Sequence, residues 1–197
     1  MSGDLFPVFL KLAGRPVLVV GAGPVAESKL QALLAAGARV TVVAPEVRPS
    51  IERQPVTIVR RGFDPSDLDG VWFVVAAAPP AVNRAVADAA ESRAIFVNAA
   101  DDPASASAYL GGVVRRDGVT LSISTDGRAP ALAGLLREGL NEVLPDDLGR
   151  WMTEADRCRV EWKASGVPMV DRRPRLLAAI NALYPPVPSA DAGDHRS

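Results

Sequence analysis

The sequence predicts an α/β fold in which a doubly wound parallel sheet is followed by a small hairpin-plus-helix domain. Three observations lead to this prediction. Short apolar runs alternate with helix-forming segments through residue 100, which is typical of a parallel sheet covered by helices on both faces. A glycine-rich turn joins the first apolar run to the first helix. After residue 101 the alternation gives way to a hairpin pattern and then to helices alone.

The first predicted unit is strand, turn, helix and strand. Residues Pro16–Val20 read PVLVV, a continuous apolar run that fits a strand buried on both faces. Residues 27–37 read ESKLQALLAAG, which predicts a helix with its leucines on one side and Gly37 at its end. Residues 38–45, ARVTVVAP, form the next strand. This order predicts a βαβ unit.

The alternation then continues along the chain. We expect strands at Val56–Arg60, Val71–Ala77 and Ile95–Ala100, with an alanine-rich helix over residues 80–93 before the last of them. All of these strands should join one parallel sheet through right-handed crossovers.

The pattern of the second part is different. Asp117 and Gly118 stand between two β-prone runs, and Asp-Gly is a strong signal for a two-residue hairpin. A helix is expected from Pro130, with further helices over residues 151–163 and 175–183. Residues 185–197 are rich in proline and polar residues, and we expect them to form a disordered tail.

Composition excludes several classes of function. The formal net charge is −1, without the basic excess of a nucleic-acid-binding protein. One cysteine, Cys158, and one histidine, His195, offer neither a disulfide nor a zinc knuckle, so no metal site is predicted. The N-terminus lacks signal-peptide form, and no apolar stretch reaches the ~18 residues of a membrane span. We therefore expect a cytoplasmic protein with a small-molecule substrate and no membrane partner.

The glycine turn has the form of a dinucleotide fingerprint. Gly21, Gly23 and Ala26 give the G-x-G-x-x-A pattern directly after a strand and at the start of a helix. In this pattern the first glycine permits the tight turn, the second lets a pyrophosphate approach the backbone, and the third small residue allows close helix packing. The helix N-terminus then attracts the phosphates. The alternative is a tight turn that binds nothing.

The end of the second strand indicates which dinucleotide is bound. The fingerprint expects an acid there for the ribose hydroxyl, and the sequence reads Ala44, Pro45 and Glu46. Either Glu46 or the backbone of Pro45 would bind the ribose hydroxyl. Arg48 lies nearby but not at the tip. The sequence therefore favours NAD over NADP.

These observations divide the chain into four regions. Residues 1–110 are predicted to form a Rossmann-type NAD-binding domain, and residues 111–150 a hairpin and a helix. Residues 151–184 form a C-terminal helical region, and the tail follows.

The order of the motifs resembles one enzyme family. The segments LFPVFLKLAGRPVLVVGAGPVAESK, VTVVAP, FVNAADDP and STDGRAPALAGLLREGL are similar to those of the precorrin-2 dehydrogenases of the siroheme synthase type, some of which are also sirohydrochlorin ferrochelatases. The resemblance covers roughly residues 5 to 180. No methyltransferase domain follows, so the chain is similar to the stand-alone form.

This resemblance implies a reaction and a proton acceptor. NAD+ takes a hydride from precorrin-2, a proton leaves, and sirohydrochlorin forms; bifunctional members then insert Fe2+. The family's base lies in a pattern like N-x-x-D-x-P, which here is Asn98, Asp101 and Pro103. Asp101 would thus be the catalytic residue, with Asp102 as an adjacent alternative. A purely structural alternative is that both acids cap a turn.

The resemblance also implies contacts with the cofactor and the substrate. Pro24, Val25, Pro45 and Glu46 would touch the cofactor, and Asn98, Ser124, Thr125 and Arg128 the substrate. Because the substrate carries eight carboxylates, further arginines of the second part, Arg115, Arg116 and Arg137, are candidates for contact or for a solvated surface. The family's A-A-T motif is replaced here by Ala76, Ala77, Ala78, Pro79 and Pro80.

Other functions stay open at this point. Another NAD-linked reductase with the same fold would tolerate the altered motif, and a non-catalytic NAD-sensing or ligand-binding module would need only the glycine turn. The motifs do not separate dehydrogenases with chelatase activity from those without it. The resemblance implies a homodimer formed through the second domain, for which the apolar helix Leu132–Leu140 and the hairpin are candidate surfaces.

Overall fold

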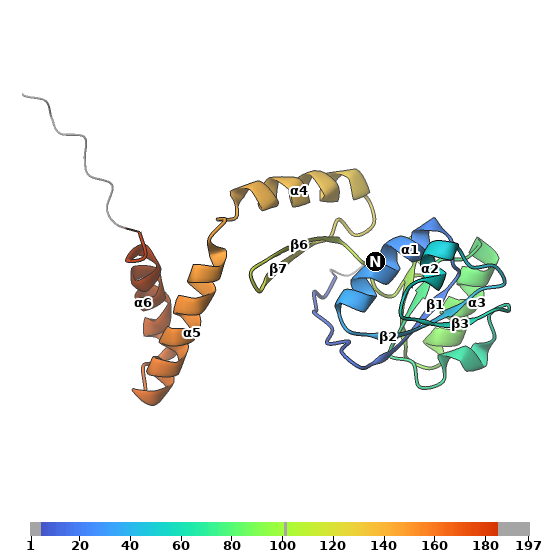
Figure 1. Cartoon of the computed structure of the whole chain (residues 1–197), viewed down its shortest axis with the longest axis horizontal. Coiled ribbons are helices and arrows are strands. Elements are labelled where there is room, and N and C mark those ends of the chain that lie inside the picture. Colours follow the sequence, from blue (N-terminus) through green and yellow to red (C-terminus); the bar gives the residue numbers. More distant parts are fainter. Residues whose placement is uncertain (1–4, 101, 185–197) are drawn as a thin grey trace, which may run out of the picture. The chain divides into compact units, whose positions relative to one another are not determined.

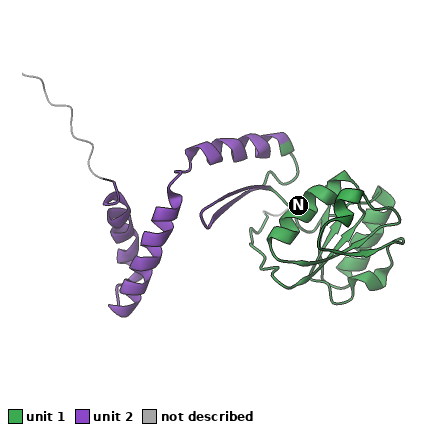
Figure 2. Cartoon of the chain, viewed as in Figure 1, with its two compact units in different colours: residues 1–111, 124–130 green, residues 112–123, 131–197 purple. Residues whose placement is uncertain are grey.

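The computed structural model describes residues 5–100 and 102–184 (Figure 1). The chain forms two compact units (Figure 2). The first unit extends to Gly111 and also includes Ser124–Pro130, while the second consists of Gly112–Ile123 and the chain from Ala131 onward. Each unit has its own secondary structure and is described separately.

The first unit is built on a parallel sheet of five strands. Its strands are β1 (Pro16–Val20), β2 (Arg39–Val43), β3 (Thr57–Val59), β4 (Phe73–Ala76) and β5 (Phe96–Ala99). They lie in the order β3-β2-β1-β4-β5, and every neighbouring pair is parallel. This confirms the predicted doubly wound α/β fold. The strand order reverses between β1 and β4, which is where ligands bind in such sheets.

The two faces of the sheet bury alternate residues of the same strands. In β1, Val17 and Val19 belong to one hydrophobic cluster, whereas Leu18 and Val20 belong to the other. Because β1 is covered on both faces, its sequence is continuously apolar and not alternating. This is the reason that PVLVV was recognisable as a strand.

Helices and single turns cover the two faces. Those of the first unit are α1 (Pro24–Ala35), α2 (Pro49–Glu52), η1 (Pro65–Leu68), α3 (Pro80–Glu91) and η2 (Pro103–Ser105). Leu30 of α1 and Ile51 of α2 pack into one cluster, and Leu68 of η1 and Val86 of α3 pack into the other. The turns α2, η1 and η2 were not anticipated, because each is shorter than a helical period can reveal.

Helix α1 begins three residues earlier than the sequence pattern predicted. The expected start was residue 27, but Pro24 is the first helical residue and Gly23 is the N-cap. Proline is favoured there because its fixed φ suits a helix and its missing N–H would have no partner in the first turn. Pro24, Val25 and Ala26, the last three residues of the glycine motif, therefore lie within the first turn of α1.

The second unit contains an antiparallel hairpin and three helices. Strands β6 (Gly112–Arg116) and β7 (Val119–Ile123) pair across a turn at Asp117 and Gly118. Both turn residues have positive φ, 48° and 86°, as a type I′ hairpin turn requires. The Asp-Gly prediction is therefore confirmed.

The helices of the second unit are α4 (Pro130–Val143), α5 (Leu148–Ala164) and α6 (Met169–Asn181). Cys158, Trp162 and Val167 form the small core between α5 and α6, with Leu176 and Ala179 packed against it. Helix α6 was predicted to begin at residue 175, and that start is wrong. The helix begins at Met169 and contains Pro174, where packing of α6 against α5 outweighs the lost backbone hydrogen bond.

In the two described stretches, no helix is both long and apolar enough to cross a lipid bilayer.

A buried asparagine fastens the loop that follows β4. The side chain of Asn83, on α3, is 3% exposed, and its Oδ1 accepts a hydrogen bond of 2.9 Å from the backbone N–H of Ala78. This bond holds the segment that replaces the family's A-A-T motif. The backbone of the altered segment is thus held in place although the threonine of the A-A-T motif is missing.

The substitution Asn83→Ala should destabilise the first unit by about 1–3 kcal/mol, because it leaves the partly buried N–H of Ala78 without its acceptor. Native-state hydrogen exchange of the β4 amides would measure this change. The variant Glu91→Ala, at an exposed position of the same helix, is the control and should change the free energy of opening by less than about 0.5 kcal/mol. Equal effects of the two variants would contradict the role given to Asn83.

Candidate cofactor and substrate site

The turn after β1 allows an unusually close approach of two backbone segments. Gly21 has φ of +100°, and a Cβ built on it would lie 2.2 Å from the carbonyl oxygen of Ala77. Its N–H donates a hydrogen bond of 2.9 Å to the carbonyl of Val43, at the end of β2. Both the sign of φ and the lack of space therefore require glycine at this position.

The carboxyl ends of three strands are joined at this edge. The N–H of Ala77, after β4, donates to the carbonyl of Val20 at 2.8 Å, and the N–H of Ala100, after β5, donates to the carbonyl of Ala76 at 2.8 Å. The glycine turn, the loop after β4 and the end of β5 are consequently neighbours. Residues that follow β5 emerge beside the crevice where the strand order reverses.

Gly23 has a different role from Gly21. It is the N-cap of α1 with φ of −87°, a value that any residue adopts, and a Cβ built on it would meet no atom within 4 Å. The fold therefore does not require glycine here, but an approaching ligand would. Ala26, the third residue of the motif, is completely buried in the cluster beneath α1.

A cavity of about 250 Å³ opens beside this turn. Its walls are Ala22, Gly23, Glu46, Val47 and Arg48. It thus joins the glycine turn to the end of β2, the two places that bind the pyrophosphate and the adenosine ribose in a dinucleotide-binding unit.

The predicted cofactor residues surround this cavity or adjoin it. Pro24 and Val25 form the exposed first turn of α1, and Pro45 is exposed next to Glu46. The open N-terminus of α1 presents free N–H groups and the positive end of the helix dipole, which suit an anionic pyrophosphate. The residues present therefore fit a nicotinamide dinucleotide.

The two candidate bases differ in what the structure says of them. Asp101 lies outside the described residues. Asp102 is described, and one of its carboxylate oxygens accepts a hydrogen bond of 2.6 Å from the hydroxyl of Ser105. This bond is the main reason that the pKa of Asp102 lies below its usual value. Asp102 is the N-cap residue of η2, and its carboxylate is bonded to a hydroxyl within that turn.

Asn98 lies at the end of β5 and is 7% exposed. Its Nδ2 donates to the carbonyl of Ala108 at 3.0 Å, which fixes the orientation of the amide. Its Oδ1 is buried without a hydrogen-bond partner among the residues that the structure describes. A buried acceptor in this state is favourable only when a donor from a ligand or water reaches it.

The loop before α4 belongs to the first unit and lies against the segment after β5. A Cβ built on Gly127 would be 3.5 Å from side-chain atoms of Pro103 and Tyr109. Within the loop, the hydroxyl of Ser124 accepts from the N–H of Asp126 and that of Thr125 accepts from the N–H of Ala129, both at 3.2 Å. The contact of Gly127 with Pro103 thus lies two residues after the predicted Ser124–Thr125 pair and involves the proline of the N-x-x-D-x-P pattern.

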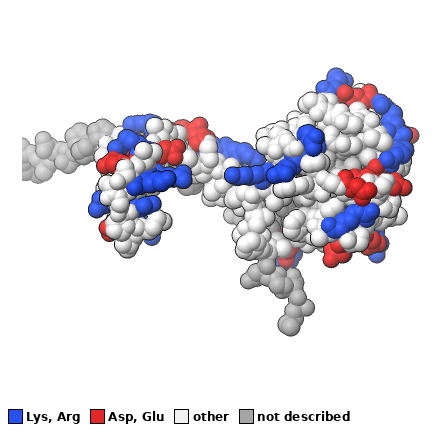
Figure 3. Space-filling model, turned by 90° about the horizontal axis from the view of Figure 1, so that it is seen from below, with Lys and Arg blue, Asp and Glu red and all other residues white. Residues whose placement is uncertain are grey.

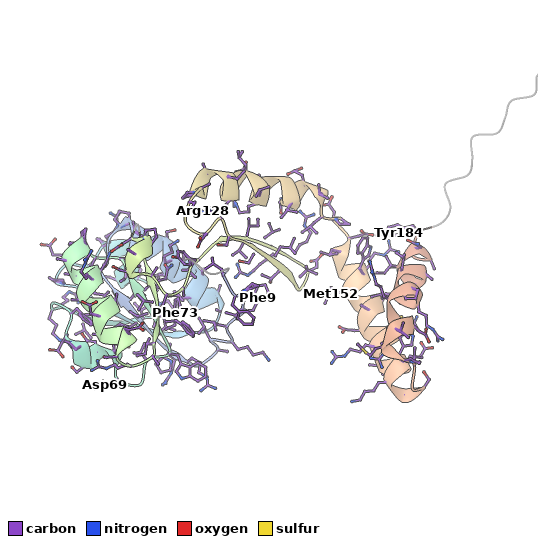
Figure 4. All side chains as sticks on the ribbon, turned by 180° about the vertical axis from the view of Figure 1, so that it is seen from behind. Phe9, Asp69, Phe73, Arg128, Met152 and Tyr184 are labelled. Carbon is purple, nitrogen blue, oxygen red and sulfur yellow. The ribbon has the colours of Figure 1, made fainter. Side chains whose placement is uncertain are left out.

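The arginines proposed for the substrate have unequal freedom. The side chain of Arg128 is 83% exposed, and its Nε lies 4.0 Å from a carboxylate oxygen of Asp126. It stands in the loop at the start of α4 (Figure 4). Arg116 instead donates to the carbonyls of Asn141 and Leu144 at the end of α4. Arg116 therefore ties the hairpin to α4 and is not a free carboxylate ligand.

Sequence reasoning did not single out one residue of this region, Glu27. Its carboxylate bonds the Nε of Arg48 at 3.1 Å. The two residues are 21 positions apart, so no local pattern could pair them.

On the face of the first unit that Figure 3 shows, basic and acidic residues are interspersed.

Substitutions at the two glycines should separate folding from binding. Gly21→Ala should strongly destabilise the first unit, because its Cβ would overlap the Ala77 carbonyl. Gly23→Ala should fold normally but bind a dinucleotide at least tenfold more weakly, since the new methyl group occupies the space of the pyrophosphate. Thermal unfolding and calorimetric titration with NAD+ measure the two effects, with Gly62→Ala, which also has open space around its Cβ, as control. Unchanged binding by the Gly23 variant would contradict the assignment of the cavity.

Comparison with known proteins gives a consistent result. Residues 8–112 match the family described as "Putative NAD(P)-binding". The chain is 39% identical over 175 residues to siroheme synthase 1 of Aeromonas hydrophila subsp. hydrophila, and 40% identical over 175 residues to siroheme synthase of Citrobacter koseri. Each alignment covers 86% of this chain but only 38% of the relative, so the chain spans less than half the length of these curated relatives.

A solved structure extends the similarity to nearly the whole chain. The structure of SirC, a precorrin-2 dehydrogenase, is 29% identical with a TM-score of 0.71, and the match covers 91% of this chain and 92% of that one. The glycine turn and its cavity lie inside the region matched by the family. The chain therefore belongs to this NAD(P)-binding family, together with the siroheme synthases and the precorrin-2 dehydrogenase that it resembles.

Proposed function

We propose that this protein is an NAD+-dependent precorrin-2 dehydrogenase that oxidises precorrin-2 to sirohydrochlorin. The observation that carries the proposal is the dinucleotide cavity beside Gly23, placed at the same sheet edge from which the chain leaves β5 toward the N-x-x-D-x-P segment. The similarity to SirC over 91% of the chain supports the same substrate.

The reaction removes two electrons and two protons from the substrate. Nicotinamide, when bound, accepts one hydrogen with both electrons as a hydride. The protein's own residues must hold the substrate in place and accept the other hydrogen as a proton. We assign the proton to a carboxylate that follows β5.

Asp101 is the carboxylate that we propose as the base. Asp102 is less suited to the role, because its carboxylate is engaged by the Ser105 hydroxyl and its pKa is lowered by that bond, which makes it a weaker proton acceptor. The buried Oδ1 of Asn98, which has no hydrogen-bond partner within residues 5–100 and 102–184, offers an acceptor on the same strand end for an N–H group of the substrate.

The substrate's carboxylates call for cations close to this edge. Arg128 is the described arginine of the first unit that fits this role best, because it is exposed and adjoins the loop that packs against Pro103. Ser124 and Thr125 would supply hydroxyl contacts, once their present hydrogen bonds within the loop are shared with a ligand.

We propose NAD+ and not NADP+ as the cofactor. Glu46 lines the cavity at the end of β2, and a carboxylate there accepts hydrogen bonds from the ribose hydroxyls and repels a 2′-phosphate.

The substitution Asp101→Ala should lower kcat by about a hundredfold or more while leaving the Kd for NAD+ within about twofold of the wild-type value. Asp102→Ala is the matched neighbour and should keep most of the activity. NADH absorbance with precorrin-2 measures turnover, and calorimetry measures binding. Wild-type turnover by the Asp101 variant would move the base elsewhere, and absence of NADH formation by the unmodified protein would favour a sensor over an enzyme.

Insertion of Fe2+ into the product is a separate activity, which can be assayed with the same purified protein. Incubation with sirohydrochlorin and Fe2+, followed by the tetrapyrrole spectrum against a metal-only control, distinguishes a bifunctional protein from a dehydrogenase alone.

We further propose that the chain forms a homodimer through the second unit. Helix α4 exposes a row of large apolar side chains: Leu132, Leu135, Leu136, Leu140 and Val143 are between 37% and 79% exposed. Such a continuous apolar face is typical of a surface that a partner covers.

Replacing Leu135 by glutamate should shift the protein from dimer to monomer, because it places a charge in the centre of this apolar face. Light scattering coupled to gel filtration measures the molar mass. The variant Val160→Glu, at a 72% exposed site on α5, serves as control and should leave the mass unchanged. A dimer that persists in the Leu135 variant would exclude α4 as the interface.

A further inference from the structure

The cofactor cavity contains both side-chain types that usually distinguish NAD from NADP. Glu46 and Arg48 stand in the same wall, two residues apart. An acid at this place selects a ribose hydroxyl, whereas an arginine accommodates a 2′-phosphate. With both present, the choice between the two cofactors depends on whether the arginine is available as well as on Glu46.

The arginine of this pair is already occupied. Glu27, in the first turn of α1, accepts a hydrogen bond of 3.1 Å from the Nε of Arg48, and the two side chains are 34% and 50% exposed. The ion pair compensates the charge of Arg48 and restricts its position. Glu27 pairs with the wall residue Arg48 but does not itself line the cavity. The three residues Glu27, Arg48 and Glu46 together carry a formal charge of −1, which disfavours a further phosphate group.

We infer that Glu27 is a specificity-determining residue that withholds Arg48 from the 2′-phosphate of NADP+ and thereby favours NAD+. Glu27 acts through Arg48 and is a positioning residue. The inference rests on the proposed function, because it places a dinucleotide in the cavity beside Gly23. The interaction is partly exposed, so its effect on selectivity is moderate and weakens as salt screens it.

An ordinary structural role for Glu27 makes a different prediction. An acid in the first turn of a helix stabilises that helix through its dipole. If that were its only role, replacing it would affect both dinucleotides alike and leave the ratio of their dissociation constants unchanged. The ratio is therefore the quantity to measure, and it does not depend on catalytic activity.

The test is calorimetric titration of the full chain with NAD+ and with NADP+, in the absence of tetrapyrrole. Glu27→Gln should tighten NADP+ binding by roughly fivefold to tenfold and change NAD+ binding by less than about twofold, because the released guanidinium can bond the phosphate. The gain should shrink when the titration is repeated at high salt.

Two further variants complete the test. In the double variant with Glu27→Gln and Arg48→Met, the gain in NADP+ affinity should disappear, since the responsible cation is gone. Glu161→Gln breaks a similarly exposed glutamate–arginine pair of 3.0 Å on α5 and should change neither affinity.

An unchanged NADP+ to NAD+ ratio in Glu27→Gln would overturn the inference, and so would a gain that survives loss of Arg48. The proposed function fails in a different way. In that case the unmodified protein binds neither dinucleotide, whereas failure of the inference alone leaves NAD+ binding intact with its selectivity unaltered.

Discussion

The contact between the turn after β1 and the loop after β4 is the constraint on which the site depends. A backbone carbonyl stands where a side chain at position 21 would begin, so the two loops meet through main chain alone. Gly21 directly precedes Ala22 and Gly23, which line the cavity, and α1 begins at Pro24. The hydrogen bond from Ala100 to Ala76 brings the end of β5 to the same edge. The chemistry that we propose needs all three in one place.

The two faces of the sheet explain why this arrangement is stable. Alternate residues of β1 enter separate hydrophobic clusters, one beneath α1 and the other beneath α3. The clusters fix the strands, and the strands fix the loops that follow them. The polar groups of the site therefore lie at the rim of a packed core, on loops held by rigid elements, as is common for binding sites in α/β folds.

Much of the first unit was predictable because its signals are local. Continuous apolar runs identified the buried strands, and the glycine pattern with its flanking strand and helix identified the turn. The Asp-Gly turn of the hairpin was predictable for the same reason, since two adjacent residues carry the whole signal. The start of α6 was not, because only the packing of Leu176 and Ala179 against α5 explains a helix that continues through Pro174.

The candidate site was predictable in kind but not in its pairings. Glu46 could be expected near the ribose from its place after a strand. The bond between Glu27 and Arg48 could not, because it joins a helix to a loop across 21 positions. In the same way, a cluster of arginines in the sequence does not reveal which of them are free to bind a substrate. Arg116 donates its hydrogen bonds to carbonyls at the end of α4, whereas Arg128 is exposed.

The division into units follows the chain less simply than the sequence pattern implies. Residues Ser124–Pro130 belong to the first unit, although the hairpin before them and the helix after them belong to the second. The chain therefore passes between the units three times. During synthesis, the first unit is complete only when residue 130 has left the ribosome. The loop Ser124–Pro130 can therefore join this unit only after the hairpin has been synthesised. Neither unit corresponds to a continuous fragment that could be cut out and kept whole.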